Sequence, residues 1–127
     1  MKKTFTLTLM FVFSLLTTNC FTQEPGANDV TVNQLNEILK DSSVVLIDVR
    51  ETDEFQSLPK LARAIHVPLS EFGPAFSRLG IQKEQTFYII CRSGNRSKRL
   101  QGHLNKQGYT HAINVLGGMK EWSTIQQ

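Results

Sequence analysis

The chain has 127 residues, of which 40% are hydrophobic and 20% are charged, enough for one domain with a core of its own. The formal net charge is +3, but Lys2 and Lys3 lie in a segment with the pattern of a removable leader, and the remainder carries 12 basic against 11 acidic residues. This near balance gives little support to a general nucleic-acid or membrane-surface binder.

Residues 1–22 have the pattern of a secretory signal peptide. The two lysines form a basic start, residues 7–16 form an apolar stretch, and small and polar residues follow. The apolar stretch is shorter than the roughly 20 residues that a membrane span needs. We therefore expect a protein that is periplasmic or otherwise exported, with an uncleaved anchor as the alternative.

Cys20 allows a second interpretation of this leader. Residues 16–20 resemble a lipoprotein signal that ends before Cys20, although Asn19 is large for its position and Leu16 stands one place early. A lipid on Cys20 would anchor the protein to the membrane. An ordinary polar end of a signal peptide, which happens to contain a cysteine, is the other interpretation.

Residues 23–28 contain Pro25 and Gly26 and are interpreted as a linker to a domain that spans residues 29–127. Thr31 and Gln34 have the spacing of a capping box, which predicts a helix that begins after Thr31 and ends near Asp41.

Strands and helices are predicted to alternate along the rest of the chain. Apolar or β-branched stretches predict strands at 44–47, 64–67, 86–90 and 112–115. Helical segments are expected at 51–56, at 70–79, after residue 97 and after residue 118, with Gly80 and Gly108 as helix stops. This alternation predicts an α/β fold in which a parallel sheet is covered by helices on both faces.

The most distinctive segment is residues 91–97, Cys-Arg-Ser-Gly-Asn-Arg-Ser, between a predicted strand and a predicted helix. Such a loop directs backbone N–H groups and the positive end of a helix dipole toward the space above the sulfur of Cys91. Together with two arginines, these features favour a thiolate. Cys91 is also the only cysteine in the predicted domain, so an internal disulfide is excluded.

Three separated segments resemble the single-domain rhodaneses, the thiosulfate sulfurtransferases, here of an exported bacterial type. Residues 48–51 read Asp-Val-Arg-Glu, residues 91–97 match the family's C-x-x-G-x-R-[ST] loop, and residues 116–122 match its G-G-x-x-x-W ending. The resemblance covers residues 28–125 and implies the rhodanese-like fold, with a central parallel β-sheet. One segment departs from the pattern: the family's usual G-H-I-x-G-A is Pro-Lys-Leu-Ala-Arg-Ala at residues 59–64. We expect this segment to affect substrate preference, with Arg63 bringing a new charge near the site.

The resemblance implies that Cys91 takes the sulfane sulfur of thiosulfate as a persulfide and passes it to cyanide or another thiophilic acceptor. Arg92 is the candidate for steering the anion, and Arg96 could either face the anion or hold the shape of the loop. The predicted catalytic residue is Cys91, and the predicted substrate-binding residues are Arg92, Ser93, Gly94, Asn95, Arg96 and Ser97. A monomer without cofactor, metal or nucleic-acid partner is expected, since His66, His103 and His111 share no metal-ligand spacing.

Other functions remain open as alternatives. The domain could be a sulfur carrier for a partner protein, or a non-catalytic rhodanese-like binding module. A cysteine phosphatase is less favoured because it needs a C-x5-R loop, whereas four residues separate Cys91 from Arg96.

Overall fold

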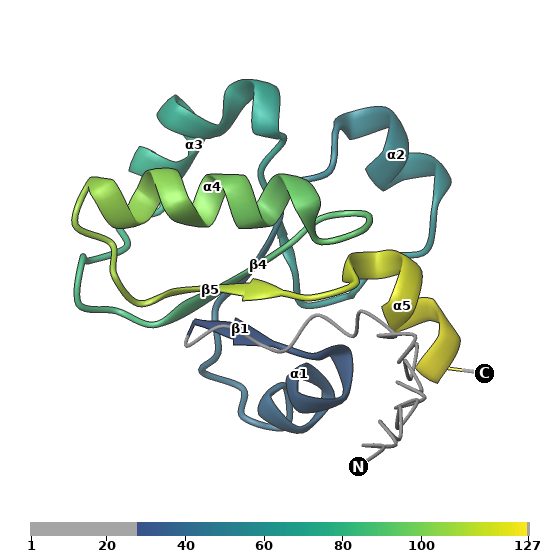
Figure 1. Cartoon of the computed structure of the whole chain (residues 1–127). Coiled ribbons are helices and arrows are strands. Elements are labelled where there is room, and N and C mark those ends of the chain that lie inside the picture. Colours follow the sequence, from purple (N-terminus) through teal and green to yellow (C-terminus); the bar gives the residue numbers. More distant parts are fainter. Residues whose placement is uncertain (1–27, 127) are drawn as a thin grey trace, which may run out of the picture.

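The structure, a computed structural model, describes residues 28–126. A five-stranded parallel sheet in the order β1-β5-β4-β2-β3 forms its centre (Figure 1). The strands are β1 (Asp29–Val30), β2 (Leu46–Asp48), β3 (Ile65–His66), β4 (Phe87–Ile90) and β5 (Ala112–Val115). The helices are α1 (Val32–Ile38), α2 (Thr52–Ser57), α3 (Phe72–Arg78), α4 (Asn95–Lys106) and α5 (Gly118–Ile125), and a 3-10 turn, η1 (Leu69–Glu71), precedes α3. The predicted signal peptide, Cys20 and the linker up to residue 27 lie outside the described residues.

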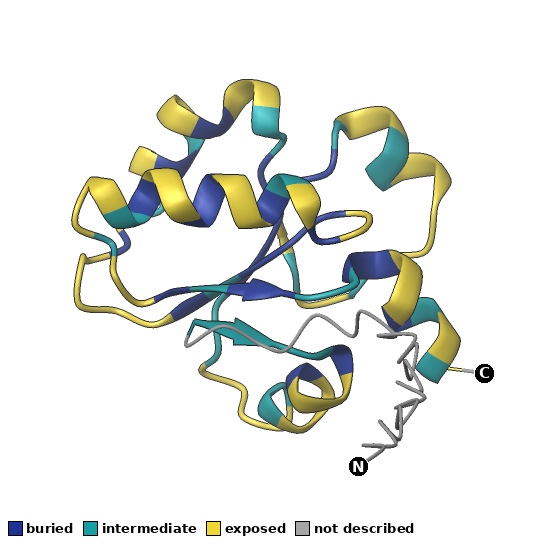
Figure 2. Cartoon of the chain, in the orientation of Figure 1, coloured by how far each residue is buried: buried dark blue, intermediate teal, exposed yellow. Residues whose placement is uncertain are grey.

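Helices cover both faces of the sheet, which confirms the predicted α/β fold. One core cluster joins α3 and α4 to the sheet through Phe76, Leu104 and the strand residue Ile89. The other joins α1 and α5 to the opposite face, with Ile90 as a strand residue. Ile89 and Ile90 serve different faces because successive side chains of a strand alternate. Figure 2 shows the result: the central strands are largely buried, the edge strand β1 is of intermediate burial, and the helices expose their outer sides.

The N-terminal edge of the sheet was only partly predicted. Thr31 and Gln34 form the predicted capping box, with both hydrogen bonds present, but α1 ends at Ile38 rather than near Asp41. Strand β1, which pairs in parallel with β5, was not predicted. A pairing of two residues leaves no periodic pattern in the sequence, because it is specified by the neighbouring strand.

Arg63 does not bring a charge to the site, and that expectation was wrong. Its guanidinium donates hydrogen bonds to the carbonyl oxygens of Leu39 (2.6 Å), Asp41 (3.1 Å) and Ser42 (2.8 Å). These carbonyls follow the end of α1, where a helix leaves acceptors unpaired and presents the negative end of its dipole. The departure from the family pattern at this position therefore serves to cap a helix.

Within residues 28–126, no helix is both long enough and apolar enough to cross a membrane.

Candidate active site at the Cys91 loop

The parallel strands bring three chain segments to one edge of the sheet. Strands β2, β4 and β5 end at this edge and lead into α2, the Cys91 loop and α5, respectively. Cys91 is the first residue after β4 and is fully buried. In parallel sheets, this is the edge at which ligands bind.

Gly94 shapes the loop that follows. It is the N-cap of α4 and has φ of 91°, in the left-handed region that favours glycine. A Cβ atom at this position would lie 3.1 Å from the backbone nitrogen of Gly117 and 3.2 Å from the carbonyl oxygen of Val115. Gly94 thus permits both the turn and the close approach of the segment before α5.

The sulfur of Cys91 points into this turn and is held by two donors. The backbone N–H of Gly94 donates to Sγ at 3.1 Å, and the buried hydroxyl of Ser97 lies 3.3 Å from Sγ. Burial, the largest single influence, raises the pKa of Cys91, but the hydrogen bonds from Ser97, Ser93 and Gly94 together hold it below its ordinary value. The structure thus brings together a buried sulfur and donors that stabilise its thiolate.

Arg96 is turned toward α2 and forms a bidentate ion pair with Glu54. Nη1 and Nη2 each donate to a carboxylate oxygen of Glu54, both at 2.6 Å. The same carboxylate accepts the backbone N–H of Glu51 at 3.2 Å, at the start of α2. The bonds from Arg96 lower the pKa of Glu54 despite the opposing effect of burial, and Glu54 raises the pKa of Arg96. The pair therefore ties the start of α4 to the start of α2.

Glu54 was not among the predicted site residues. It stands three residues after Glu51 at the end of the Asp-Val-Arg-Glu segment, which is the spacing of a capping box in a short helix. That spacing could have indicated a side chain directed back toward the sheet edge. Its pairing with Arg96 depends on how α2 and α4 are placed, which no local pattern reveals.

The start of α5 binds the backbone of the Cys91 loop. The N–H groups of Met119 and Lys120 donate to the carbonyl oxygens of Cys91 and Arg92, both at 2.8 Å. A Cβ atom on Gly118, which has φ of 58°, would lie 2.5 Å from the carbonyl oxygen of Cys91. The second glycine of the G-G-x-x-x-W segment, Gly118, is therefore explained by this close contact, which leaves no room for a side chain.

A buried ion pair between Asp48 and Arg50 lies at the end of β2, within the Asp-Val-Arg-Glu segment. Nε and Nη2 of Arg50 donate to the carboxylate of Asp48 at 2.9 and 2.7 Å, and both side chains are almost fully buried. Nε2 of His66 lies 2.9 Å from the carbonyl oxygen of Arg50, and the His66 ring stacks on Phe55. These contacts hold the end of β2 in place next to the loop.

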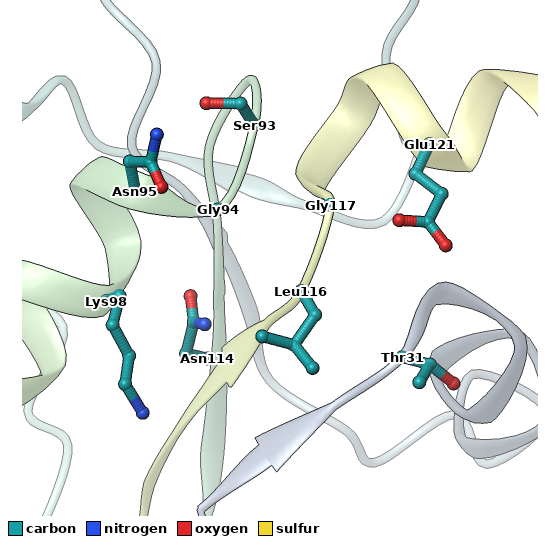
Figure 3. A pocket seen from close by; sticks show the side chains of 9 residues that line it. All are labelled: Thr31, Ser93, Gly94, Asn95, Lys98, Asn114, Leu116, Gly117 and Glu121. Carbon is teal, nitrogen blue, oxygen red and sulfur yellow. The ribbon is translucent and has the colours of Figure 1, made fainter. Parts of the chain in front are cut away.

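Two pockets flank the Cys91 loop on different sides. Figure 3 shows the first, of about 410 Å³, which is lined by Ser93, Gly94 and Asn95 and also by Lys98 and Asn114. The second, of about 230 Å³, includes Arg92 of the loop. The loop residues Arg92, Ser93 and Asn95 are exposed, so the predicted substrate-binding residues do not all line one cavity.

The rhodanese-like domain family model matches residues 31–125. The chain belongs to this family. Thiosulfate sulfurtransferase/rhodanese-like domain-containing protein 3 of Mus musculus is 30% identical over an alignment 108 positions long, which covers 76% of this chain and 69% of that protein. The solved structure of the human single-domain sulfurtransferase TSTD1 superposes with a TM-score of 0.67 at 25% identity, covering 78% of this chain and 97% of that one.

The rhodanese-like domain also matches parts of longer proteins. It is 36% identical to YrkF of Bacillus subtilis and to the adenylyltransferase and sulfurtransferase uba4 of Ogataea parapolymorpha, and it spans 43% and 20% of their lengths. Proteins named as sulfurtransferases thus occur both among relatives that this chain covers for the most part and among much longer relatives.

Proposed function

We propose that this rhodanese-like protein is a thiosulfate sulfurtransferase that transfers sulfane sulfur through a persulfide on Cys91 to cyanide or another thiophilic acceptor. The observation that carries the proposal is the placement of Sγ, 3.1 Å from the N–H of Gly94 and 3.3 Å from the hydroxyl of Ser97. This arrangement stabilises a nucleophilic thiolate at the start of a helix, where anions are favoured.

In the first step, the thiolate of Cys91 attacks the outer sulfur of thiosulfate. A bond forms between the two sulfur atoms, the S–S bond within thiosulfate breaks, and sulfite leaves with the electron pair. The N–H groups that face Sγ would stabilise the terminal sulfur of the resulting persulfide, in which the negative charge resides.

In the second step, cyanide or a thiol attacks that terminal sulfur. The new bond forms to the acceptor, the bond to Sγ breaks, and the electron pair returns to Cys91 as the thiolate. The enzyme therefore alternates between two covalent forms, which predicts ping-pong kinetics.

The two arginines of the loop take different parts in this proposal. Arg92 is exposed and no ion pair is recorded for it within residues 28–126, so it is available to an incoming anion. Arg96 is engaged by Glu54, which supports a role in holding the shape of the loop rather than in contacting the donor. Ser93, Gly94, Asn95 and Ser97 supply the remaining donors around the anion.

Intact-mass spectrometry tests the proposal directly. The purified chain, incubated with thiosulfate, should gain one sulfur atom on Cys91 and lose it when cyanide is added. The Cys91→Ser variant should gain none. Absence of a cyanide-labile adduct on the unaltered chain would contradict the proposal.

A sulfur-carrier function is the second candidate, favoured by the 36% identity to YrkF, whose description is that of a sulfur carrier protein. In that case the persulfide forms, but neither cyanide nor small thiols discharge it at a useful rate. A non-catalytic binding module would form no persulfide, and a phosphatase would release phosphate from an aryl phosphate.

Location is proposed from residues 1–22 alone. We propose export to the periplasm or beyond, with anchoring through a lipid on Cys20 as the alternative. Cell fractionation with and without residues 1–20 tests export, and the Cys20→Ala variant tests the anchor: a protein that stays in the cytoplasm contradicts export.

A further inference from the structure

The smaller of the two pockets beside the Cys91 loop lies between the connection from α2 to β3 and the start of α5. It has a volume of about 230 Å³, and its walls include Arg50, Leu58, Pro59, Arg92, Met119 and Lys120. Two of these residues bind the loop backbone directly, since the N–H groups of Met119 and Lys120 donate to the carbonyl oxygens of Cys91 and Arg92. The pocket is therefore built onto the main chain of the nucleophile. We call it the Lys120 pocket.

The charge of the Lys120 pocket is positive. Arg92 and Lys120 are exposed cations on its walls, and neither has an ion-pair partner within residues 28–126. The charge of Arg50 is balanced by Asp48, and no acidic residue lines the pocket. Two unpaired cations around a small cavity favour an anionic ligand.

The remaining wall of the pocket is aliphatic. Leu58 is 37% exposed, one of two large hydrophobic residues that are exposed within residues 28–126. Pro59 lies next to it, and the buried residue Met119, which packs in the core cluster of α1 and α5, also lines the pocket. A ligand that fits these walls carries a short aliphatic part as well as its negative charge.

We propose that the Lys120 pocket is the acceptor subsite, and that it selects aliphatic thiols that carry a carboxylate. This inference rests on the proposed function. The carboxylate binds Arg92 and Lys120, and the methylene groups contact Leu58, Pro59 and Met119. A cavity of about 230 Å³ holds roughly seven water-sized groups, the size of a small mercapto acid.

The chemical step needs no further reagent. The thiolate of the bound acceptor attacks the terminal sulfur of the Cys91 persulfide and forms a new S–S bond. The bond between Sγ and that sulfur breaks, and its electron pair restores the Cys91 thiolate. The acceptor leaves as a persulfide, so atoms and electrons balance.

The test starts from the Cys91 persulfide, formed with thiosulfate and freed of excess reagent, and follows its loss by rapid quenching and intact mass. The probes are 3-mercaptopropionate, the neutral 2-mercaptoethanol and the cationic cysteamine, compared at equal thiolate concentration because their thiol pKa values differ. We expect 3-mercaptopropionate to saturate and to react about fivefold faster than 2-mercaptoethanol below saturation. Cysteamine should be the slowest of the three.

Lys120→Ala should remove most of the preference for 3-mercaptopropionate over 2-mercaptoethanol, measured as the ratio of the two rates within the same variant. The matched control is Lys106→Ala, which removes an exposed lysine from the far end of α4 and should keep the preference. Leu58→Ala tests the aliphatic wall. In the series mercaptoacetate, 3-mercaptopropionate and 4-mercaptobutyrate, each added methylene should improve apparent affinity by up to about fourfold in the unaltered chain and by less in Leu58→Ala.

The outcomes separate this inference from the function on which it rests. Equal rates with anionic and neutral thiols, or a preference that Lys120→Ala retains as fully as Lys106→Ala, overturn the acceptor subsite while the persulfide chemistry stands. If thiosulfate forms no persulfide on Cys91, the proposed function itself fails.

Discussion

Ser97 places a hydroxyl between two atoms that can both accept its proton. Its Oγ lies 3.3 Å from Sγ of Cys91 and 3.2 Å from the carbonyl oxygen of Gly94, and the residue is fully buried. One hydroxyl proton serves one acceptor at a time. When Cys91 ionises, the charged sulfur is the stronger acceptor, so the proton is drawn to it. Ser97 therefore stabilises the thiolate more than the thiol.

Replacing Ser97 with Ala should raise the pKa of Cys91. Because hydrogen bonds hold that pKa below its ordinary value, we expect the rate of the proposed persulfide formation to rise with pH up to this pKa and then to level off. In Ser97→Ala the rise should shift to higher pH, and the rate below the native pKa should fall about fivefold, since a hydrogen bond of about 1 kcal/mol is lost. The pH profile of persulfide formation or of alkylation by iodoacetamide measures this.

The control for Ser97→Ala is Ser77→Ala, on the exposed side of α3, where the hydroxyl bonds only to the carbonyl oxygen of Gly73. Its pH profile should match that of the unaltered chain. An unshifted profile in Ser97→Ala would show that the backbone N–H groups alone set the pKa of Cys91.

At the scale of elements, two contacts fix the loop between helices. Glu54 and Arg96 join α2 to α4, and the N–H groups of Met119 and Lys120 join α5 to the loop backbone. Both contacts join segments that follow the carboxyl ends of parallel strands. The loop is thus held in place from two sides, while its exposed residues remain available to a ligand.

Glu54→Gln should weaken the contact between α2 and α4. The pair with Arg96 is largely shielded from solvent, with 29% and 20% of the two side chains exposed, so we expect the free energy of unfolding to fall by about 1 kcal/mol. Glu37→Gln, which removes an exposed ion pair with Lys40 on α1, should change it by much less. Urea unfolding measures both.

Glu54 also makes a prediction for activity, as a positioning residue that acts through Arg96. A loop that is held less firmly should raise KM for thiosulfate, while the pH midpoint of persulfide formation stays near its native value. Equal unfolding free energies of the two variants, or an unchanged KM, would show that the ion pair does not position the loop.

Gly118→Ala should disrupt the contact between α5 and the backbone of the Cys91 loop. The added Cβ would meet the carbonyl oxygens of Cys91 and Arg92 at 2.5 and 2.7 Å, and the backbone has a left-handed φ of 58°. We expect a loss of about 2–4 kcal/mol in the free energy of unfolding and slower persulfide formation. Gly102→Ala, on α4 with no atom within 4 Å of an added Cβ, should instead stabilise the chain by up to about 1 kcal/mol. A Gly118→Ala variant as stable as the native chain would refute the close approach.

At the scale of the whole molecule, Arg63 links two segments that lie far apart in sequence. It lies in the connection from α2 to β3 and donates three hydrogen bonds to the carbonyls after α1. The segment at residues 59–64 therefore contributes to the architecture through Arg63, while its beginning, Pro59, lines the Lys120 pocket.

Arg63→Ala should lower the free energy of unfolding by about 1 kcal/mol, because exposed carbonyls at the end of α1 lose a cap but regain water. The rate of persulfide formation with thiosulfate should stay unchanged. Thermal unfolding and the mass-spectrometric rate measure the two effects, with Lys106→Ala as a control for the loss of one positive charge. A slower reaction with thiosulfate would mean that Arg63 contributes to the electrostatic field at the site after all.

The sequence by itself determined the alternation of strands and helices, the glycine stops at Gly80 and Gly108, and the placement of Cys91 between a strand and a helix. These features depend on residues close in sequence, so periodicity, capping and turn chemistry reveal them. Strand β1 could not be predicted in this way, because a strand of two residues has no periodic pattern. It is a strand because it pairs with β5.

Only the tertiary structure decided what surrounds the sulfur. Arg96 could have faced the anion or the loop, and its pairing with Glu54, 42 residues away, became visible only when α2 and α4 were placed. The same holds for Arg63 at the end of α1 and for Gly118 against the carbonyl oxygen of Cys91. Such contacts depend on side-chain direction and on distances of a few ångströms between distant segments, which are set by packing of the whole core rather than by local sequence.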